Sequence, residues 1–397
     1  MNQKKYNNRW LLPDGIDEVL PPDALAVEQL RQMVLKLYHS WGYDLVMPAM
    51  IEFTDSLLTG TAHSLDRKTF TLVDQLTGKQ MGIRSDMTPQ VARIDAHQLA
   101  NSGTSRLCYC GNLLHAQAEG LNPARSPLQI GAEIFGNASI DADIEVVCLM
   151  LETLQRIPLQ NVSIDLGHVG IFRSLFAQSG LDRTLENQLF EMLQRKAIPE
   201  LKAFLLEQSL TDDKREQFRQ LALLNGDAET IEEARLVFND AGSDCMAALD
   251  HIEAVARGVQ QQYPQVMIHF DLSELRGYEY HTGLVFAAFL PGQGQEIARG
   301  GRYDDIGSVF GVARPATGFS ADLLNLYRLA NILLPVQPAI LAPQNSDPDL
   351  SRLVNKLREK GERVVIDLSH GEQSPQQQNC NQHIIHNGRQ WVVNDIN

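Results

Sequence analysis

The chain has 397 residues, of which 44% are hydrophobic, and these proportions suit a globular protein of two or three domains. Its 34 Lys and Arg residues face 49 Asp and Glu residues, and the formal net charge of −15 argues against nucleic acid as the natural partner. No apolar run has the length of a membrane span, and the start MNQKKYNNRWLLPDG is too polar for a signal peptide. The chain is therefore expected to be cytoplasmic, with no membrane partner.

The first part of the chain predicts a helix, an interrupted strand and a hairpin. Within 21–43, apolar residues recur with helical spacing after a Pro-Pro-Asp start, which predicts an amphipathic helix that ends near Gly42. Residues 44–53 have strand composition, but Pro48 cannot donate to a ladder, so it suits an edge or an interface. Residues 70–84 predict a hairpin that turns at LTGK.

Two strands and a helix follow. RLCYCGNLL (106–114) and SPLQIGAEIFG (126–136) predict strands, and a helix is expected over about 141–156, with aspartates as acceptors at its start. Cys108 and Cys110 are spaced to share one face of a strand. None of the five cysteines forms a C-x-x-C pair, so we expect reduced structural thiols in preference to a metal site.

Residues 170–262 carry long charged helical patterns and few strand signals, which predicts a helical insertion with solvated faces. Strands return at 265–273, 283–291 and 295–304, so we expect an antiparallel sheet that the insertion splits and that is completed after it. The core domain is thus predicted over 1–169 and 263–335.

Residues 336–397 predict a small C-terminal α/β domain. The strand-like stretches AILAP, RVVIDLS and QWVVND accompany a helical pattern over 347–361. The intervening residues 370–383, HGEQSPQQQNCNQH, are expected to form an exposed polar loop.

Four stretches carry most of the information about function: MGIRSDMTP (81–89), RLCYCGNLLHAQAEGLNPARSPLQIGAEIFG (106–136), ELRGYEYHTGLVF (274–286) and ARGGRYDDIG…RPATGF (298–319). Their order resembles histidyl-tRNA synthetase over roughly residues 10–335. The resemblance implies an α+β fold of the class II aminoacyl-tRNA synthetase type, an antiparallel sheet flanked by helices, with self-association around the first motif at Pro48. No P-loop or dinucleotide fingerprint is present, and no cofactor is expected.

Free histidine presents an ammonium, a carboxylate and an imidazole with two nitrogens. By resemblance, Asp86 and Thr88 serve the ammonium, Gln129 and Arg276 the carboxylate, and Glu133 an imidazole N–H. The whole set of expected histidine-binding residues is Asp86, Thr88, Arg125, Gln129, Glu133, Arg276, Tyr280, His281 and Tyr303. Two of them depart from the family pattern, because Asp86 is one methylene shorter than the usual glutamate and His281 replaces a tyrosine.

Simpler structural roles stay open for several of these residues. Arg276 could form an ion pair with Glu279 or Asp304, and Gln129 could satisfy backbone groups. Asp86 and Thr88 could cap a helix in which Pro89 takes a first-turn position. Tyr280 and Tyr303 could be core aromatics, and His281 a satisfied core histidine. Glu133 is different, because an unpaired carboxylate on an apolar strand is costly.

Activation of an amino acid with ATP needs cations on the triphosphate. Compared with the synthetase motifs, His115 and Asn325 stand in place of two arginines, Gln117 replaces a glutamate and Asp322 replaces a glycine. A mostly neutral imidazole and a neutral amide do not replace an arginine fork. The resemblance therefore implies an amino-acid pocket beside a lost ATP site.

This combination resembles the regulatory subunits of ATP phosphoribosyltransferase. It implies a non-catalytic protein of histidine biosynthesis that binds the short catalytic subunit, activates its reaction of ATP with phosphoribosyl pyrophosphate, and transmits feedback inhibition by histidine. The short C-terminal region and the negative charge argue against tRNA binding. Two rivals stay open: a divergent histidyl-tRNA synthetase, and a histidine sensor with another partner.

Overall fold

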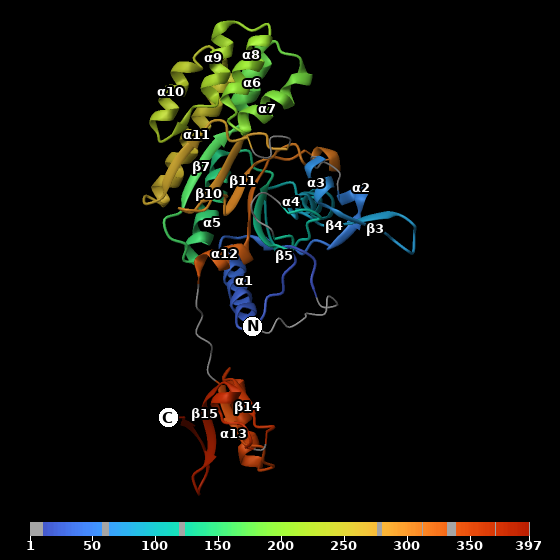
Figure 1. Cartoon of the computed structure of the whole chain (residues 1–397), viewed down its shortest axis with the longest axis vertical. Helices are drawn as coiled ribbons and strands as arrows, with labels where there is room; N and C mark the ends of the chain where they lie inside the picture. Colours follow the sequence, from blue (N-terminus) through green and yellow to red (C-terminus); the bar gives the residue numbers. More distant parts are fainter. Residues whose placement is uncertain are drawn as a thin grey trace, which may run out of the picture. The chain divides into compact units, whose positions relative to one another are not determined.

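The computed structural model describes residues 11–57, 63–118, 124–275, 280–311, 313–331, 339–369 and 371–396. The chain divides into two compact units, Met1–Ile332 and Leu333–Asn397, which Figure 1 shows in one view.

The first unit is built on a mixed but mainly antiparallel sheet. Within the described ranges, nine strands join in the order β1-β5-β6-β12-β11-β10-β7-β9-β8. Only the pairs β1–β5 and β7–β9 are parallel. The strands are β1 (Asp44–Leu45), β5 (Ser105–Asn112), β6 (Leu128–Phe135), β7 (Ser163–His168), β8 (Asn225–Gly226), β9 (Met267–Asp271), β10 (Leu284–Phe289), β11 (Ala298–Arg302) and β12 (Ala316–Asp322). The predicted α+β class, with a sheet completed after a helical segment, is confirmed.

Helices pack on this sheet: α1 (Asp23–Ser40) contacts β5, α5 (Ile140–Arg156) contacts β6, β11 and β12, and α12 (Leu323–Ala330) contacts β6 and β12. The predicted apolar stripe of α1 faces the core, where Val34 and Tyr38 are fully buried. Gly42 follows the end of α1 with φ +84°, a conformation that glycine adopts readily, so the predicted end of this helix is confirmed.

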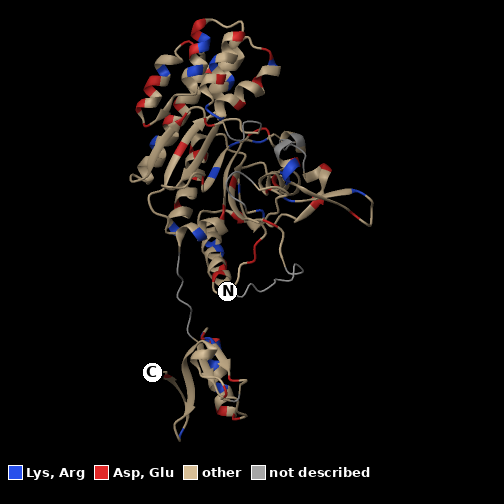
Figure 2. Cartoon of the chain, viewed as in Figure 1, with Lys and Arg blue, Asp and Glu red and all other residues tan. Residues whose placement is uncertain are grey.

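Residues between β7 and β9 form a helical segment that gathers at one end of the sheet (Figure 1). Its helices are α6 (Val169–Ser179), α7 (Glu186–Gln194), α8 (Ile198–Glu207), α9 (Asp212–Leu221), α10 (Glu229–Val237) and α11 (Ser243–Gln262), with a 3-10 turn at Arg183–Leu185. Long α11 joins the segment to the rest of the unit, because it packs on α5, α6 and β7. Charges of both signs are scattered over these helices, as expected for solvated faces (Figure 2).

A small second sheet carries the predicted hairpin. Its order is β2-β4-β3, with β2 (Ile51–Phe53), β3 (Phe70–Val73) and β4 (Gln80–Ile83), all antiparallel. Short helices surround it: α2 (Thr54–Leu57), α3 (His63–Lys68), α4 (Thr88–Arg93) and a π-helical turn (Ile94–Leu99). Pro48 lies between β1 and β2, so it interrupts the strand as predicted, and its carbonyl accepts from Arg84 Nη1 at 2.7 Å.

The second unit has a four-stranded sheet in the order β14-β13-β15-β16. Its elements are β13 (Ala339–Ala342), α13 (Pro348–Glu359), β14 (Val364–Ile366), a 3-10 turn (Gln376–Gln378), β15 (Cys380–His386) and β16 (Trp391–Asp395). The loop predicted over 370–383 is wrong in its last four residues, because β15 begins at Cys380. This strand is polar except at the buried Cys380 and Ile384 and the exposed Ile385, and its pairing with β13 and β16 stabilises it.

Three other sequence expectations need correction. Strands β7 and β12 lie inside the main sheet although neither was predicted. The aspartates near the start of α5 do not cap it: the N-cap is Ser139, and Asp143 turns inward to Arg302.

The described cysteines are all free thiols, as predicted, and Cys108 is buried in β5. In the described part of the chain, no group of three or more His, Cys, Asp or Glu residues is arranged to hold a metal ion. No helix among the described residues is long and apolar enough to cross a membrane.

Candidate functional site

A cavity of about 520 Å³ lies against strands β6, β10, β11 and β12. Six of the nine predicted histidine-binding residues line it: Asp86, Thr88, Glu133, Tyr280, His281 and Tyr303. They come from segments that are far apart in sequence, so the fold brings them together around one space.

Glu133 is the centre of a hydrogen-bond network on the wall of this cavity. Its side chain projects from β6 and the residue is only 1% exposed. Oε1 accepts from Tyr109 Oη at 2.9 Å and from Thr88 Oγ1 at 3.1 Å, while Oε2 accepts from Tyr303 Oη. These donors stabilise the carboxylate, but the two oxygens also face a space in which a ligand N–H could be accepted.

Two glycines make room for this network. Gly318 pairs with Glu133 across β12 and β6, and a Cβ there would lie 1.4 Å from Glu133 Oε2. Gly131 pairs with Tyr109, and a Cβ there would lie 2.3 Å from the tyrosine hydroxyl. A side chain at either position would displace the network, so both backbones must approach this closely.

Burial is the main influence on Glu133 and raises its pKa to about 8. The hydrogen bonds from Tyr303, Tyr109 and Thr88 act in the opposite direction, and the nearby Asp86 carboxylate raises the pKa further. A carboxyl group whose pKa lies near neutral pH beside a cavity exchanges its proton when a suitable partner enters.

Asp86 and Thr88 lie at the start of α4. Asp86 Oδ1 accepts from the Thr88 backbone N–H at 3.0 Å and from Gln129 Nε2 at 2.9 Å. Pro89 occupies the first turn of the helix, as predicted, but the N-cap position is held by Met87 and not by Asp86 or Thr88. Asp86 thus has a local structural role and lines the cavity as well.

Gln129 and Arg125 do not line the larger cavity. Gln129 is 7% exposed, and besides holding Asp86 it accepts from the Met87 backbone N–H at 3.0 Å. Arg125 donates to the backbone carbonyls of His115 and Asp14, and its guanidinium lies 5.3 Å from the ring centroid of Phe70.

The stretch that contains Arg276 and Glu279 falls outside the described residues, so the structure does not place the predicted carboxylate contact. The two residues that follow are described: Tyr280 and His281 line the cavity, with ring centroids 4.3 Å apart. His281 is 6% exposed and would touch a Cβ at Gly301 of β11. It therefore lies in the wall between β10 and β11.

A smaller cavity of about 190 Å³ adjoins the first and shares Leu65, Lys68, Asp86, Arg299 and Ser320 with it. His115, Asp322 and Asn325, which were expected by resemblance to depart from the synthetase motifs, line this smaller cavity.

The charges around the smaller cavity are unsuited to a triphosphate. Among the described residues that line it, the carboxylates are those of Asp86, Glu296 and Asp322, and the cations are those of Lys68 and Arg299. Asp322 caps α12 through the Leu324 N–H, and burial raises its pKa although backbone N–H groups oppose this effect.

A chain of polar groups connects β7, α11, α5 and β11. His168 Nδ1 accepts from the Gly170 N–H at 3.0 Å, so in a neutral ring its Nε2 carries the proton and donates to His251 Nδ1 at 3.3 Å. His251 Nε2 then donates to Asp143 at 2.9 Å, and Arg302 lies 3.0 Å from the same carboxylate. Asp143 is fully buried, so this ion pair anchors β11 to α5 next to Tyr303.

Sequence reasoning missed three features of this region. Tyr109 was not predicted as a site residue; the available signal was a tyrosine on the inward face of β5 opposite a glycine. The Asp143–Arg302 pair had no signal, because its partners are far apart in sequence. Gln194 and Arg195 of the helical segment also line the larger cavity.

Comparison with known families gives two matches. The family model described as histidyl-tRNA synthetase matches residues 15–326, and the one described as ATP phosphoribosyltransferase subunit HisZ C-terminal domain matches residues 337–394. Together they cover the two compact units.

Full-length relatives and solved structures agree. The chain is 52% identical to an ATP phosphoribosyltransferase regulatory subunit of Thioalkalivibrio sulfidiphilus, with 98% of this chain and 99% of the relative covered. It is 48% identical to a protein of the same description from Alkalilimnicola ehrlichii, with 98% of each covered. A solved ATP phosphoribosyltransferase regulatory subunit/histidyl-tRNA synthetase from Bacillus halodurans C is 25% identical, with a TM-score of 0.83 over 93% of this chain and 95% of that one. A histidyl-tRNA synthetase from Nostoc shares the fold, with 18% identity and a TM-score of 0.77 over 98% and 97% of the two chains.

Proposed function

Because the chain belongs to the family of ATP phosphoribosyltransferase regulatory subunits, we propose that it binds the short catalytic subunit, activates it and transmits inhibition by histidine. In this proposal the chain itself performs no chemistry, and the glycosyltransferase reaction between ATP and phosphoribosyl pyrophosphate takes place on the partner. The proposed place of action is the cytoplasm.

The larger cavity is the proposed histidine site. The observation that most supports this proposal is the position of Glu133. This buried carboxyl group has a pKa of about 8 and faces a cavity lined by polar and aromatic side chains. An imidazole can take the proton of such a group and donate an N–H back to the carboxylate. Asp86 and Thr88 are proposed for the ammonium, with Tyr280, His281 and Tyr303 as walls and Arg276 toward the carboxylate.

The smaller cavity supports a role without adenylation. Adenylation would transfer AMP from ATP to the histidine carboxylate and release pyrophosphate, and the charge that develops on the phosphates must be balanced by cations. Three carboxylates and two cations line the position where His115 and Asn325 replace arginines. Additional negative charge from a triphosphate is unfavourable there.

We also propose self-association around Pro48. Apolar side chains are exposed near it, among them Met47 at 80%, Met50 at 44% and Phe53 at 40%. A cluster of this kind is typical of an interface between protein chains. The proposed partner is a second copy, in the manner of the class II dimer, and no tRNA takes part.

The experiment that tests the proposed function measures formation of phosphoribosyl-ATP by the short catalytic enzyme, with and without this chain, at several histidine concentrations. We expect the rate to rise on mixing and to fall again as histidine is added. If the rate does not respond to this chain, the proposal fails. A rate that responds to the chain but not to histidine would refute the feedback role alone.

Because the histidyl-tRNA synthetase family model matches residues 15–326, the alternative function of a divergent synthetase should also be tested. A divergent synthetase would exchange labelled pyrophosphate into ATP in the presence of histidine. We expect no histidine-dependent exchange above background, and exchange by the purified chain would replace the regulatory proposal with an enzymatic one.

A further inference from the structure

The corner between α7 and α8 lines the larger cavity. Gln194, the last residue of α7, and Arg195, its C-cap, are among the lining residues. The other lining residues come from the sheet, from α3 and α4, and from the loops beside them. The helical segment therefore contributes two residues to the wall of the cavity that is proposed as the histidine site.

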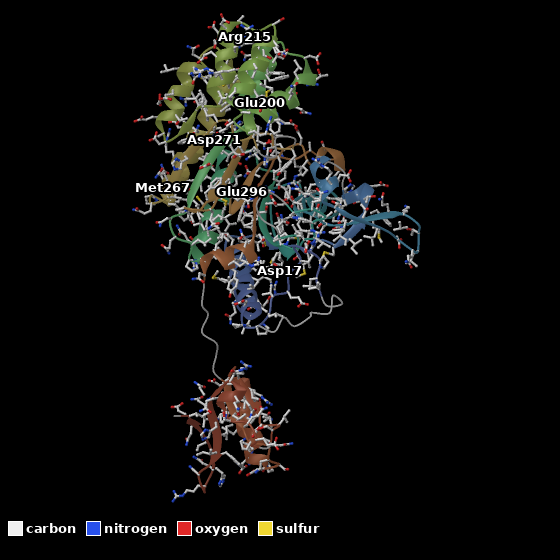
Figure 3. The ribbon with its side chains drawn as sticks, viewed as in Figure 1. Asp17, Glu200, Arg215, Met267, Asp271 and Glu296 are labelled. Carbon is white, nitrogen blue, oxygen red and sulfur yellow. The ribbon has the colours of Figure 1, made fainter. Side chains whose placement is uncertain are left out.

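The corner is attached to the sheet at one point that the structure shows clearly. Lys196, which follows Arg195 with φ +49°, donates to Asp271 Oδ2 at 2.8 Å. Asp271 ends β9, and the chain continues from it to Glu274, which also lines the cavity. Figure 3 labels Asp271 at the end of the sheet and Glu200 on the neighbouring helical segment.

A bound amino acid needs a cation for its carboxylate, since an unpaired carboxylate in a partly buried site is costly. The Gln129 side chain bonds to Asp86 and to the Met87 N–H, and the residue lines the smaller cavity and not the larger one. The described cations around the larger cavity are Lys68, Arg195 and Arg299.

Arg195 fits the carboxylate best of these three. Lys68 and Arg299 also line the smaller cavity among its carboxylates, and Arg299 donates to Glu296 at 3.1 Å. Arg195 lines the larger cavity but not the smaller one. Its guanidinium forms an ion pair with Glu200 at 3.0 Å. Both side chains of that pair are about 60% exposed, so water screens it and a ligand carboxylate can replace Glu200.

We propose that Arg195 is a specificity-determining residue that binds the carboxylate of the ligand. Through this contact, a ligand bound in the cavity also holds the helical segment that carries Arg195. This inference rests on the proposed histidine site. A carboxylate accepts from several donors, so this contact does not exclude the Arg276 contact proposed above. Arginine presents two parallel N–H groups to a carboxylate, which lysine cannot do.

The test compares two probes, histidine and histamine, which share the imidazole and the amine but differ in the carboxylate. Their dissociation constants are measured on the full chain, histidine directly and histamine by displacement of labelled histidine. We expect Arg195→Ala to weaken histidine about tenfold and histamine less than about twofold, because only histidine loses a charge-assisted hydrogen bond. Arg195→Lys should recover part of the loss, and Arg183→Ala, an exposed arginine of the same segment outside the cavity, should change neither constant.

The outcomes separate the inference from the proposed function. Equal weakening of both probes by Arg195→Ala would mean that the corner only supports the fold, and unchanged histidine affinity would exclude the contact. Either result overturns the role of Arg195 while histidine binding stands. Failure of the unmodified chain to bind histidine would overturn the proposed site, and the inference with it.

Discussion

Glu133→Gln separates the charge of the central carboxyl group from its shape. Glutamine keeps the length and planarity of the side chain but cannot ionise, and the hydroxyl groups of Tyr109 and Tyr303 can still bond to it. The structure therefore predicts that this substitution changes how stability depends on pH more than it changes the packing.

The size of the effect follows from the two pKa values. The ordinary pKa is 4.5 and the folded value is about 8, so the folded state holds the proton more tightly. The stabilisation of the folded state by protonated Glu133 is fully present below pH 4.5 and is lost as pH rises through about 8. At about 1.4 kcal/mol per pH unit, the wild-type chain should lose about 3 kcal/mol relative to Glu133→Gln between pH 5 and pH 7.5. Glu133 is buried, so solvent screening reduces this little.

The assay is chemical denaturation of both proteins at a series of pH values, followed by a signal from the first unit. The difference in unfolding free energy should move steadily in favour of the glutamine variant as pH rises. A difference that stays constant with pH, or that moves in favour of the wild type, would refute the raised pKa and the burial argument behind it.

Three further predictions concern the larger cavity and the elements that support it. Histidine affinity should be greatest between about pH 6.5 and 8, because Glu133 and the ligand imidazole then hold one proton between them. Calorimetric titration with histidine from pH 5 to 9 checks this, and an affinity that does not change with pH would contradict it. Arg302→Ala removes the arginine partner of the buried Asp143 carboxylate, which then keeps the His251 contact, and should cost about 3 kcal/mol of unfolding free energy by denaturation; a loss below about 1 kcal/mol would count against the pair. Gly318→Ala should cost about 1–3 kcal/mol and abolish histidine binding, whereas Gly103→Ala, where a Cβ meets nothing within 4 Å, should do neither.

Much of the fold could be predicted because its elements have strong local patterns. The stripe of α1, the LTGK hairpin and the charged helices between β7 and β9 each follow a period that the sequence displays. Strands β7 and β12 were not predicted, because their sequences SIDLGH and ATGFSAD contain glycine and polar residues. Their stability comes from the strands that pair with them on both sides. Strand β15 was not predicted for the same reason, because it is stabilised by pairing with other strands and its own sequence carries no strand pattern.

The site could be predicted where resemblance gave positions, and less well where side chains must meet in space. Glu133, Thr88 and Tyr303 lie together as expected, but the residues that surround Glu133 also include Tyr109, whose role depends on the register of β5 against β6. Arg195 reaches the cavity only because a helical segment folds back on the sheet. No pattern in a single sequence reports such a contact.

The most direct test of the account is the histidine inhibition curve of the catalytic subunit, measured with the wild-type chain and with Glu133→Gln. Because coupling between sites is reciprocal, weaker histidine binding to this chain must shift inhibition to higher histidine concentrations. We expect the variant to activate as the wild type does and to need at least about tenfold more histidine for half inhibition. Equal activation with an unchanged inhibition curve would contradict the account, since histidine would then act somewhere other than the cavity of Glu133.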